Sequence, residues 1–262
     1  MEHLEGKQSI FAAIQARQRR FDVILLRHGA HEEKFAEVLA AAAERNIPVR
    51  RVDGHELDEM AHGATHGGIL AVVTAKPRMN VAELTARLDA LRLPPLLLLL
   101  EGIEDSRNLG FTLRSAEALG AHAVLIKKHI WDFDAVEVAR PASGAYERMP
   151  LVQIEDVGPL QQLQRRGLRL LGCLSGVRGT IFQTDLSVGS IIAVGGEKRG
   201  LSGAVRSICD GFMTIPSVPG AASLSLSHAA SIIMAEAMRQ RLPKAPTEFL
   251  AGAAIEEEAE EE

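Results

Sequence analysis

Hydrophobic positions in this chain follow two alternating patterns. Short apolar runs, which are typical of buried strands, occupy residues 21–26, 49–52, 68–73, 96–100, 122–126, 168–173, 190–195 and 212–215. Apolar residues at helical spacing predict helices at 31–45, 55–60, 81–92, 109–120, 134–139, 157–166, 201–209 and 223–241, and Ser9 is expected to cap another near the start. Because strands and helices alternate, the pattern predicts an α/β fold with a parallel or mixed sheet covered by helices.

Two breaks in the pattern divide the chain. A polar, proline-containing stretch at 76–80 ends the first series of strands, and Pro94-Pro95 precedes the next one. We therefore expect a small α/β domain at 1–75, a linker at 76–93, an α/β domain with an open parallel sheet at 94–245, and a disordered acidic tail at 246–262. In such open sheets, ligand-binding loops gather at the carboxyl ends of the strands.

Composition and charge narrow the class of protein. The chain is 47% hydrophobic and 24% charged, as expected of a soluble globular protein. Its formal net charge is −5, but the last seven residues hold six glutamates, which leaves residues 1–255 at +1. Charge alone therefore neither supports nor excludes RNA as a partner. Two cysteines, no basic and apolar leader, and no apolar run long enough to span a bilayer predict a cytoplasmic protein without membrane contact.

Three segments at predicted strand ends combine small residues with chemically useful ones. They are Asp105–Glu117, Val194–Leu201 and Ile215–Ser227. The first is expected to place Asn108 and Arg114 around the first turn of a helix, and the second holds Glu197 in a Gly-rich loop. Small residues at a turn that opens a helix let a ligand approach backbone N–H groups. These segments therefore mark a candidate ligand site.

In this order, the three segments resemble the three motifs of the SpoU/TrmH branch of the SPOUT RNA methyltransferases. Three further strings, Glu5–Phe11, Ala64–Leu70 and Ala142–Ala145, also resemble this family, the first two matching its N-terminal substrate-binding domain, which is similar to ribosomal protein L30e. The resemblance implies transfer of a methyl group from S-adenosylmethionine to a ribose 2′-hydroxyl of RNA. It also implies a deep trefoil knot in the C-terminal domain and a homodimer formed through that domain. The two-domain layout favours ribosomal RNA of the 23S type over transfer RNA.

The resemblance also assigns roles to individual residues. The candidate catalytic residues are Asn108, Arg114, Glu197, Ser223 and Ser225. The candidate cofactor contacts are Gly195, Gly200, Ile215, Pro216 and Leu224. Because arginine stays protonated at ordinary pH, Arg114 is expected to activate the ribose hydroxyl electrostatically and to hold a phosphate, with any proton passing to the substrate.

Departures from the family pattern leave other functions open. The family commonly has Asn where this chain has Ser225, Gly where it has Lys198 or Pro219, and Ser or Ala where it has Gly196. Lys198 would be strained if its position required a positive φ. These departures favour the alternative of a non-catalytic or altered RNA-binding relative. A Rossmann-type dinucleotide enzyme is disfavoured, because no G-x-G-x-x-G follows the first strand of either predicted domain.

The remaining expectations concern partners. Arg17, Arg19, Arg20 and Arg27 form a basic cluster that is a candidate for RNA phosphate contacts. Only 4% of residues are aromatic, which favours recognition of RNA shape and backbone over base stacking. The histidines and cysteines form no recognisable metal-ligand set, so no metal is expected. The helix at 223–241 is apolar around most of its surface, as expected if a second subunit covers part of it.

Overall fold

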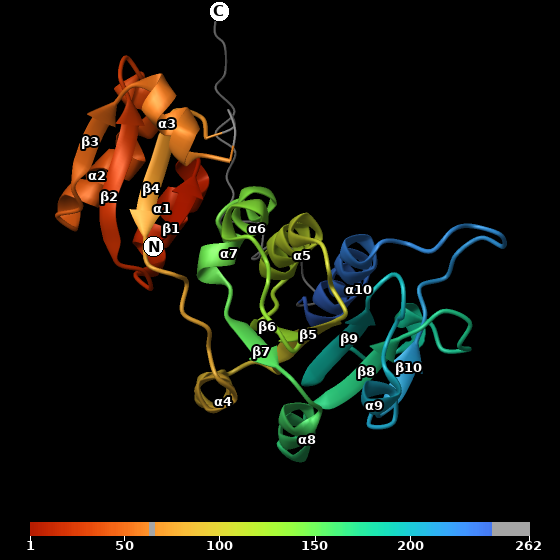
Figure 1. The fold of residues 1–262 in the computed structure, drawn as a ribbon. Coiled ribbons are helices and arrows are strands. Elements are labelled where there is room, and N and C mark those ends of the chain that lie inside the picture. The colour runs from red at the N-terminus through yellow and green to blue at the C-terminus, as the bar shows by residue number, and fades with distance from the viewer. Residues whose placement is uncertain (63–65, 243–262) are drawn as a thin grey trace, which may run out of the picture.

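The computed structural model describes residues 1–62 and 66–242 and divides them between two sheets with helical cover (Figure 1). This confirms the predicted α/β class. The tail at 246–262, like Ala64 and Thr65 of the second substrate-domain string, lies outside the described residues. No described helix is long and apolar enough to cross a membrane.

The first sheet has four strands in the order β1-β4-β2-β3. They are β1 (Glu2–Glu5), β2 (Phe21–Arg27), β3 (Val49–Val52) and β4 (Ile69–Val73). Only β2 and β3 run parallel, so the sheet is mixed. Its helical elements are α1 (Lys7–Ala16), η1 (Glu32–Phe35), α2 (Ala36–Glu44) and α3 (Gly54–Met60).

The second sheet has six parallel strands in the order β10-β8-β9-β5-β6-β7. They are β5 (Leu96–Glu101), β6 (Ala123–Lys127), β7 (Leu151–Ile154), β8 (Arg169–Cys173), β9 (Ser190–Gly195) and β10 (Gly211–Met213). The register aligns Glu101 with Gly195 on one side and with Lys127 on the other. The carboxyl ends of β9, β5 and β6 therefore form one row. The knot expected in this domain remains a prediction.

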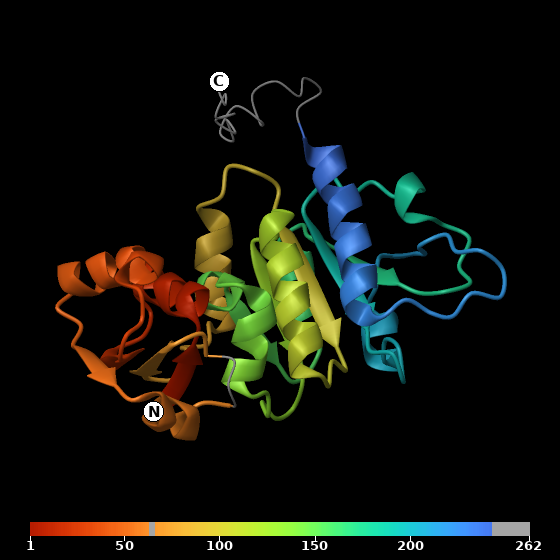
Figure 2. The same cartoon turned by 90° about the horizontal axis from the view of Figure 1, so that it is seen from above.

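Helices cover both faces of the second sheet because its strands alternate between two apolar cores. Leu98 and Leu100 of β5 pack with one set of helices, and Leu97 and Leu99 pack with the other. The first set is α5 (Ser106–Ala118), α6 (Ala135–Ala142), α7 (Ala145–Arg148) and α10 (Leu226–Arg241), and the second is α4 (Val81–Asp89), α8 (Gly158–Arg165) and α9 (Gly203–Arg206). A further 3-10 turn, η2, spans Ile181–Gln183. Seen from above, α10 lies beside α5 (Figure 2).

The predicted linker at 76–93 is closely packed on the second sheet. Its helix α4 begins at Asn80 with a capping box to Glu83, and it buries Leu84 and Leu88 in the core below the sheet. The N–H of Met79 donates to the carbonyl of Leu151 at the start of β7. This segment therefore attaches the first domain firmly to the second.

A buried ion pair joins the two domains. Arg19, which is 3% exposed, donates from Nε and Nη2 to the two carboxylate oxygens of Glu147 at 2.8 and 2.9 Å. Its Nη1 reaches Glu2 at 2.6 Å and the Thr74 carbonyl at 3.0 Å. Desolvation is the largest effect and opposes the charge on Arg19, but attraction to Glu147 together with the hydrogen bonds to Glu147 and Glu2 raises the pKa of Arg19. All guanidinium nitrogens of Arg19 are thus used within the protein.

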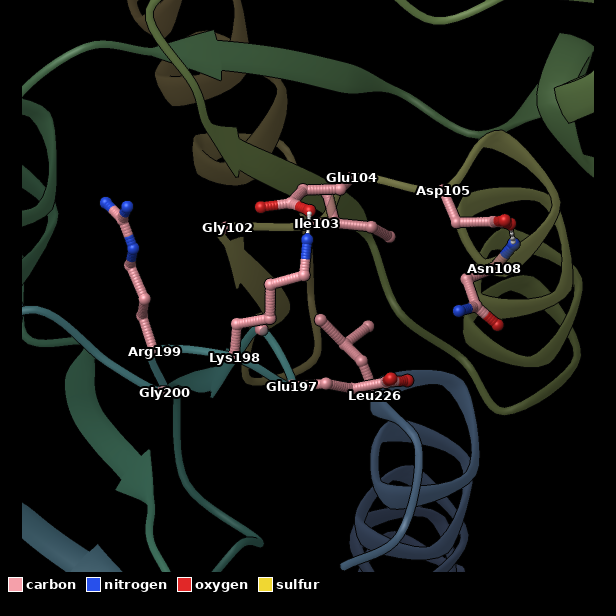
Figure 3. A pocket seen from close by; sticks show the side chains of 11 residues that line it. Gly102, Ile103, Glu104, Asp105, Asn108, Glu197, Lys198, Arg199, Gly200 and Leu226 are labelled. Carbon is pink, nitrogen blue, oxygen red and sulfur yellow. Dashed lines mark hydrogen bonds and ion pairs between the residues drawn. The ribbon is translucent and has the colours of Figure 1, made fainter.

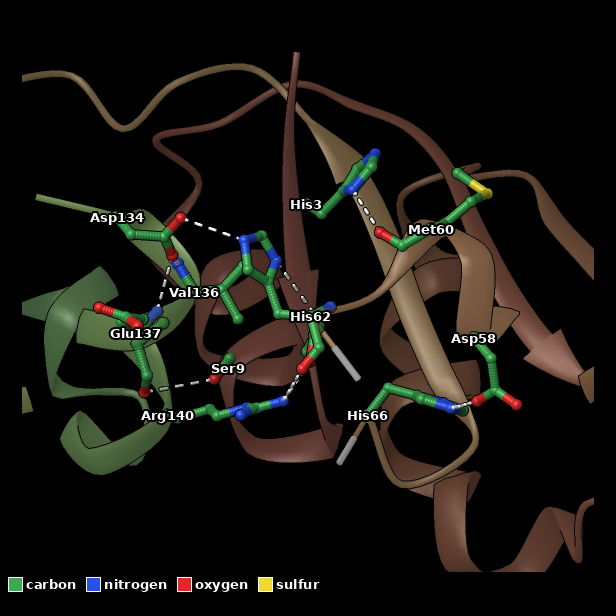
Figure 4. A network of polar contacts seen from close by, with 12 residues as sticks. His3, Ser9, Asp58, Met60, His62, His66, Asp134, Val136, Glu137 and Arg140 are labelled. Atoms are coloured by element: carbon green, nitrogen blue, oxygen red, sulfur yellow. Dashed lines mark hydrogen bonds and ion pairs between the residues drawn. The ribbon is translucent and has the colours of Figure 1, made fainter. Parts of the chain in front are cut away.

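A second polar network crosses the same junction (Figure 4). The buried carboxylate of Glu5 accepts from Nη2 of Arg140 at 2.7 Å and from the N–H of His62 at 2.6 Å. Nε2 of His62 lies 3.2 Å from Asp134 of the second domain. Ser9, predicted to cap a helix, is instead a buried residue of α1, and its hydroxyl donates to the Ala139 carbonyl. The cap position belongs to Gly6, whose φ of 83° suits glycine.

The structure adds elements that hydrophobic pattern did not reveal. These are β1, η2, α7 and β7, all of four residues or fewer. Predicted strands 96–100, 168–173 and 190–195 match observed strands to within one residue at either end. The helix predicted at 223–241 begins only at Leu226, because Ser225 is its N-cap.

Candidate active site

Loops from three parallel strands meet at one edge of the second sheet. They follow β5, β9 and β10. The first loop leads into α5, which holds most of the segment 105–117, and the other two loops hold most of the segments 194–201 and 215–227. The loop after β10 leads into α10, which packs against α5 at the end of the first loop. The parallel topology therefore brings together residues that lie more than a hundred positions apart.

The larger of two cavities at this edge has a volume of about 340 Å³. Its walls come from the ends of β8 and β9 and from the segment 214–229. Predicted residues that line it are Gly195, Glu197, Gly200, Ile215, Ser223 and Leu224. Pro216, predicted as a cofactor contact, is exposed and is not part of the lining.

The smaller cavity, of about 170 Å³, lies between the loops after β5 and β9 (Figure 3). Asn108 lines it from the first turn of α5, and Leu226 lines it from α10. Nζ of Lys198 pairs across the cavity with the carboxylate of Glu104 at 2.6 Å, and this contact lowers the pKa of Glu104. Gly196, Glu197, Gly200 and Leu226 line both cavities, so the two form one site divided by the loop 196–200.

The dividing loop is held so tightly that glycine is required at its base. The N–H of Gly200 donates to the Gly196 carbonyl at 2.8 Å, which folds the loop back on itself. A Cβ on Gly195 would lie 2.2 Å from the carbonyl carbon of Gly200, and one on Gly196 would lie 2.3 Å from the carbonyl oxygen of Gly102. Backbone therefore forms this part of the site directly.

Lys198 is free of the strain considered from the sequence. Among the described residues, only Arg17, Asn46 and Ser143 combine a side chain with a positive φ, and the positive φ of this loop falls on Gly200. The loop thus obtains its turn two residues later than the family pattern suggested. Lysine at position 198 costs no backbone strain.

Glu101 fixes the loop from the neighbouring strand, and it belongs to none of the three segments that the sequence pattern predicts as the site. Its carbonyl accepts from the N–H of Gly196 at 2.7 Å, and its carboxylate accepts from the N–H of Ser202 at 2.7 Å. Nζ of Lys127 neutralises the same buried carboxylate at 2.9 Å. The available signal was a charged residue directly after five consecutive leucines, where a buried strand ends.

Serines connect the first and third segments. The Oγ of Ser225 caps α10 by accepting from the N–H of His228, and it also lies 2.6 Å from Nδ1 of that histidine. It is 3.1 Å from Oγ of Ser227, which donates to the side-chain oxygen of Asn108 at 3.3 Å. The serine at 225 is thus linked to Asn108 through one intermediate hydroxyl.

Arg114 lies apart from both cavities. It is six residues beyond Asn108 on α5, which corresponds to about 9 Å along the helix axis. The prediction that the two residues flank one helical turn is therefore wrong. Arg114 is exposed, and within residues 1–62 and 66–242 its guanidinium has no ion-pair or hydrogen-bond partner.

The basic cluster of the first domain separates into two groups. Arg17, Arg20 and Arg27 are exposed. Arg19 is buried against Glu147, so the prediction that it contacts RNA is wrong. Its physical role is to hold the domains together. Among the described residues, no group of three or more metal-ligating side chains comes together.

Comparisons with known proteins agree with this arrangement. Residues 95–235 match the model of the SpoU rRNA Methylase family, and residues 3–79 match the model described as RNA 2′-O ribose methyltransferase substrate binding. The chain is 33% identical over 245 residues to 23S rRNA (guanosine-2′-O-)-methyltransferase RlmB of Pseudomonas putida, covering 93% of this chain and 98% of that protein. It is 29% identical over 246 residues to the protein of the same name from Escherichia coli K12, covering 92% and 99%.

Solved structures share the fold over almost the whole chain. A structure titled RNA 2′-O ribose methyltransferase is 27% identical with a TM-score of 0.76, covering 92% of this chain and 89% of that one. The SpoU methyltransferase AviRb from Streptomyces viridochromogenes, solved with AdoMet, is 24% identical with a TM-score of 0.75, covering 91% and 89%. Because the family model covers more than half of the chain and the curated relatives match nearly all of it, the chain belongs to the SpoU rRNA methylase family.

Proposed function

We propose that the protein methylates a ribose 2′-hydroxyl of ribosomal RNA, of the large-subunit type, with S-adenosylmethionine as methyl donor. The observation that carries the proposal is the meeting of the three loops around one backbone-lined site. Family membership and relatives named as 23S rRNA guanosine-2′-O-methyltransferases support the substrate class.

The larger cavity fits the proposed cofactor. Leu174, Ile215 and Leu224 offer an apolar surface to an adenine ring, and Ser217 offers a hydroxyl near it. The tight glycine loop at 195–200 leaves no room for side chains at its base, so a ligand there meets backbone groups. When bound, S-adenosylmethionine supplies an electrophilic methyl group.

The chain's own residues would hold and activate the RNA. Asn108 and Glu197 line the smaller cavity, where a ribose can lie next to the cofactor site. Ser223 stands at the rim of the larger cavity, and Ser225 orients the start of α10. Arg114 provides a fixed positive charge for the phosphate and for the alkoxide that develops at the 2′-oxygen.

The test is methylation of deproteinised ribosomal RNA with labelled S-adenosylmethionine, followed by mapping of the 2′-O-methylated nucleotides. One large-subunit guanosine is the expected product. Transfer RNA serves as the competing substrate, and preferential labelling of transfer RNA would contradict the ribosomal assignment. Calorimetry with the cofactor and its demethylated product should show binding of both, and no heat at saturating ligand would contradict the methyltransferase proposal.

A non-catalytic RNA-binding role is the second candidate, favoured by serine at position 225 where the family commonly has asparagine. The structure weakens the other part of that argument, because Lys198 adopts an unstrained backbone conformation. Cofactor binding without turnover on any ribosomal or transfer RNA would support this second candidate.

We also infer a homodimer through the second domain. Phe111 on α5 is 51% exposed and Ile232 on α10 is 38% exposed, and the two helices pack side by side (Figure 2). Arg114 lies one helical turn from Phe111 and is exposed as well. A partner subunit that covers this surface would take Arg114 toward its own cavities.

A further inference from the structure

A third cavity lies at the junction of the two domains, outside the site described above. It has a volume of about 90 Å³. One wall is formed by residues 75–78 between the domains, and the other by Trp131, Phe133 and Tyr146 of the second domain. We call this group of residues the junction pocket.

The junction pocket concentrates the aromatic side chains of a chain that has few. The sequence contains eight phenylalanines, one tryptophan and one tyrosine, and this pocket holds the tryptophan, the tyrosine and one phenylalanine. Each ring faces a cation. Arg78 lies 4.5 Å from the Trp131 centroid, Lys128 lies 4.1 Å from that of Phe133, and Lys76 lies 5.4 Å from that of Tyr146. Lys76, Phe133 and Tyr146 are buried, so the pair that a ligand can reach is Arg78 with Trp131. A guanidinium over an aromatic ring is a surface on which an unpaired base can stack.

Arg78 and Trp131 form a prepared stacking surface. The edge-to-face contact with Phe133, with ring centroids 5.0 Å apart, orients the half-buried Trp131. Nη1 of Arg78 donates to the side-chain oxygen of Gln153 at 2.6 Å, which fixes the exposed guanidinium above the indole. A guanidinium plane that is held in place can stack a base on its outer face.

The junction pocket lies on the path that bound RNA is expected to follow. Trp131 belongs to the loop after β6, and the sheet register aligns the end of β6 with the end of β5 beside the active-site loops. Neighbouring strands are about 5 Å apart, so β7 with Gln153 lies about 10 Å from β5. Arg78 comes from the segment matched as substrate-binding, and Trp131 comes from the segment matched as methylase.

We propose that the junction pocket binds an unpaired base of the substrate RNA, which stacks on the guanidinium of Arg78 above Trp131. The inference rests on the proposed function and adds a base-binding subsite to it. It adds base stacking to the recognition of RNA shape and backbone that the low aromatic content favours. Three of the ten aromatic residues of the chain line this pocket.

The single tryptophan makes the inference directly measurable. Titration of the full-length protein with a short mixed-sequence oligoribonucleotide should change the fluorescence of Trp131 in a saturable way. An oligomer of the same length that carries ribose and phosphate but no bases should leave the fluorescence unchanged. An equal change with the base-free oligomer would show that charge alone is sensed, and it would overturn the proposal.

Arg78→Lys keeps the charge and removes the planar group, so RNA affinity measured by this signal should fall about tenfold, as expected for one lost stacked base. Arg92→Lys is the matched control, because Arg92 is exposed before β5 at the opposite end of that strand from the active site. Wild-type affinity in Arg78→Lys would overturn the proposal.

Methylation kinetics separate this inference from the proposed function. Arg78→Lys and Trp131→Ala should raise KM for RNA with little change in kcat, whereas Trp131→Phe should retain most of the affinity. If Arg78→Lys methylates RNA with an unchanged KM, the proposal that the junction pocket binds a base is overturned. The proposed function is not affected by that result. A failure of the wild type to methylate any RNA, with tryptophan quenching intact, would overturn only the proposed function.

Discussion

Arg114 has a proposed role that a single substitution can test. Its charge is proposed to act on the RNA and on the developing alkoxide, both of which matter most in the transition state. We therefore expect Arg114→Ala to lower turnover by about two to three orders of magnitude, the usual cost of losing one transition-state donor. Calorimetry should show nearly unchanged cofactor binding, because Arg114 lines neither cavity.

Arg114→Lys provides the graded comparison for this prediction. It should retain part of the activity, since it keeps the charge but loses the paired N–H geometry. Near-wild-type turnover in Arg114→Ala would contradict the assignment.

Lys76 gives a pH prediction at the same scale. Burial lowers the pKa of this amine from its ordinary value of 10.5 to about 8, although Nζ donates to the Met149 carbonyl at 2.9 Å. Between pH 8 and 10.5 the unfolded chain binds the proton on Lys76 and the native protein does not, so the contribution of Lys76 to stability rises with pH in this window. Below pH 8 both states are protonated and the penalty of burying the charge is constant.

Lys76→Met should remove this dependence. Urea unfolding of both proteins at pH 7.5 and pH 10 should show the wild type gaining at most about 3 kcal/mol relative to the variant. The comparison with the variant matters, because burial also raises the pKa of Cys173 and of Cys209 to about 11, which changes stability in the opposite direction in both proteins. If the difference in unfolding free energy between the two proteins is the same at pH 7.5 and pH 10, the pKa of Lys76 is not lowered in the native protein.

The loops that form the candidate site could be predicted from the sequence. Whether a given side chain is buried or exposed could not. Glycines at 195, 196 and 200 marked a loop that only backbone contacts can form, and the structure places them there. Arg19 and Arg20 are adjacent and chemically identical, yet Arg19 is buried and Arg20 is exposed. The difference depends on Glu147, which is 128 positions away, and no local pattern contains it.

At the scale of elements, the crossing of the loops after β5 and β9 depends on Gly196. A Cβ at this position would meet the backbone oxygen of Gly102 at 2.3 Å, and a backbone atom cannot move aside cheaply. We expect Gly196→Ala to destabilise the fold by about 1–3 kcal/mol and to weaken cofactor binding, because the loop that holds Gly196 lines both cavities.

Gly203→Ala is the matched control for this element. An added Cβ at Gly203 meets no atom within 4 Å, so thermal unfolding and calorimetry of this variant should match the wild type. Wild-type behaviour of Gly196→Ala would contradict the close crossing of the two loops.

Element prediction succeeded for every long hydrophobic run and for the short strand β3, and it missed the two short edge strands β1 and β7. Five leucines in sequence identified β5 because a strand covered on both faces is apolar at every position. The edge strands β1 and β7 have four residues each and include His3 and Gln153, so their pattern is too brief and too polar to stand out. They exist because neighbouring strands offer unpaired backbone groups.

At the scale of the whole molecule, the pair of Arg19 and Glu147 links the domains. Removing one partner leaves the other charge buried without compensation, which costs about 3–5 kcal/mol. We expect Arg19→Met to lower the melting temperature by roughly 10 °C, measured by calorimetry. The double variant Arg19→Met/Glu147→Leu should recover a substantial part, because neither charge remains. A decrease of less than about 1 kcal/mol in the free energy of unfolding of Arg19→Met would show that the ion pair contributes little to stability.

The proposed dimer would build each active site from two chains. Arg114 is exposed on α5, beside Phe111 and away from the cavities of its own chain, so a partner subunit offers it a site. To test this arrangement, Arg114→Ala protein is mixed with Gly196→Ala protein so that heterodimers form. In each heterodimer, one site combines the intact loop of the Arg114→Ala subunit with the intact Arg114 of the Gly196→Ala subunit. Random exchange should restore about a quarter of wild-type turnover, since half of the dimers are mixed and each has one complete site. The two variants alone set the baseline. Full activity of a monomer, measured by light scattering at the assay concentration, would exclude a shared site and return Arg114 to its own chain.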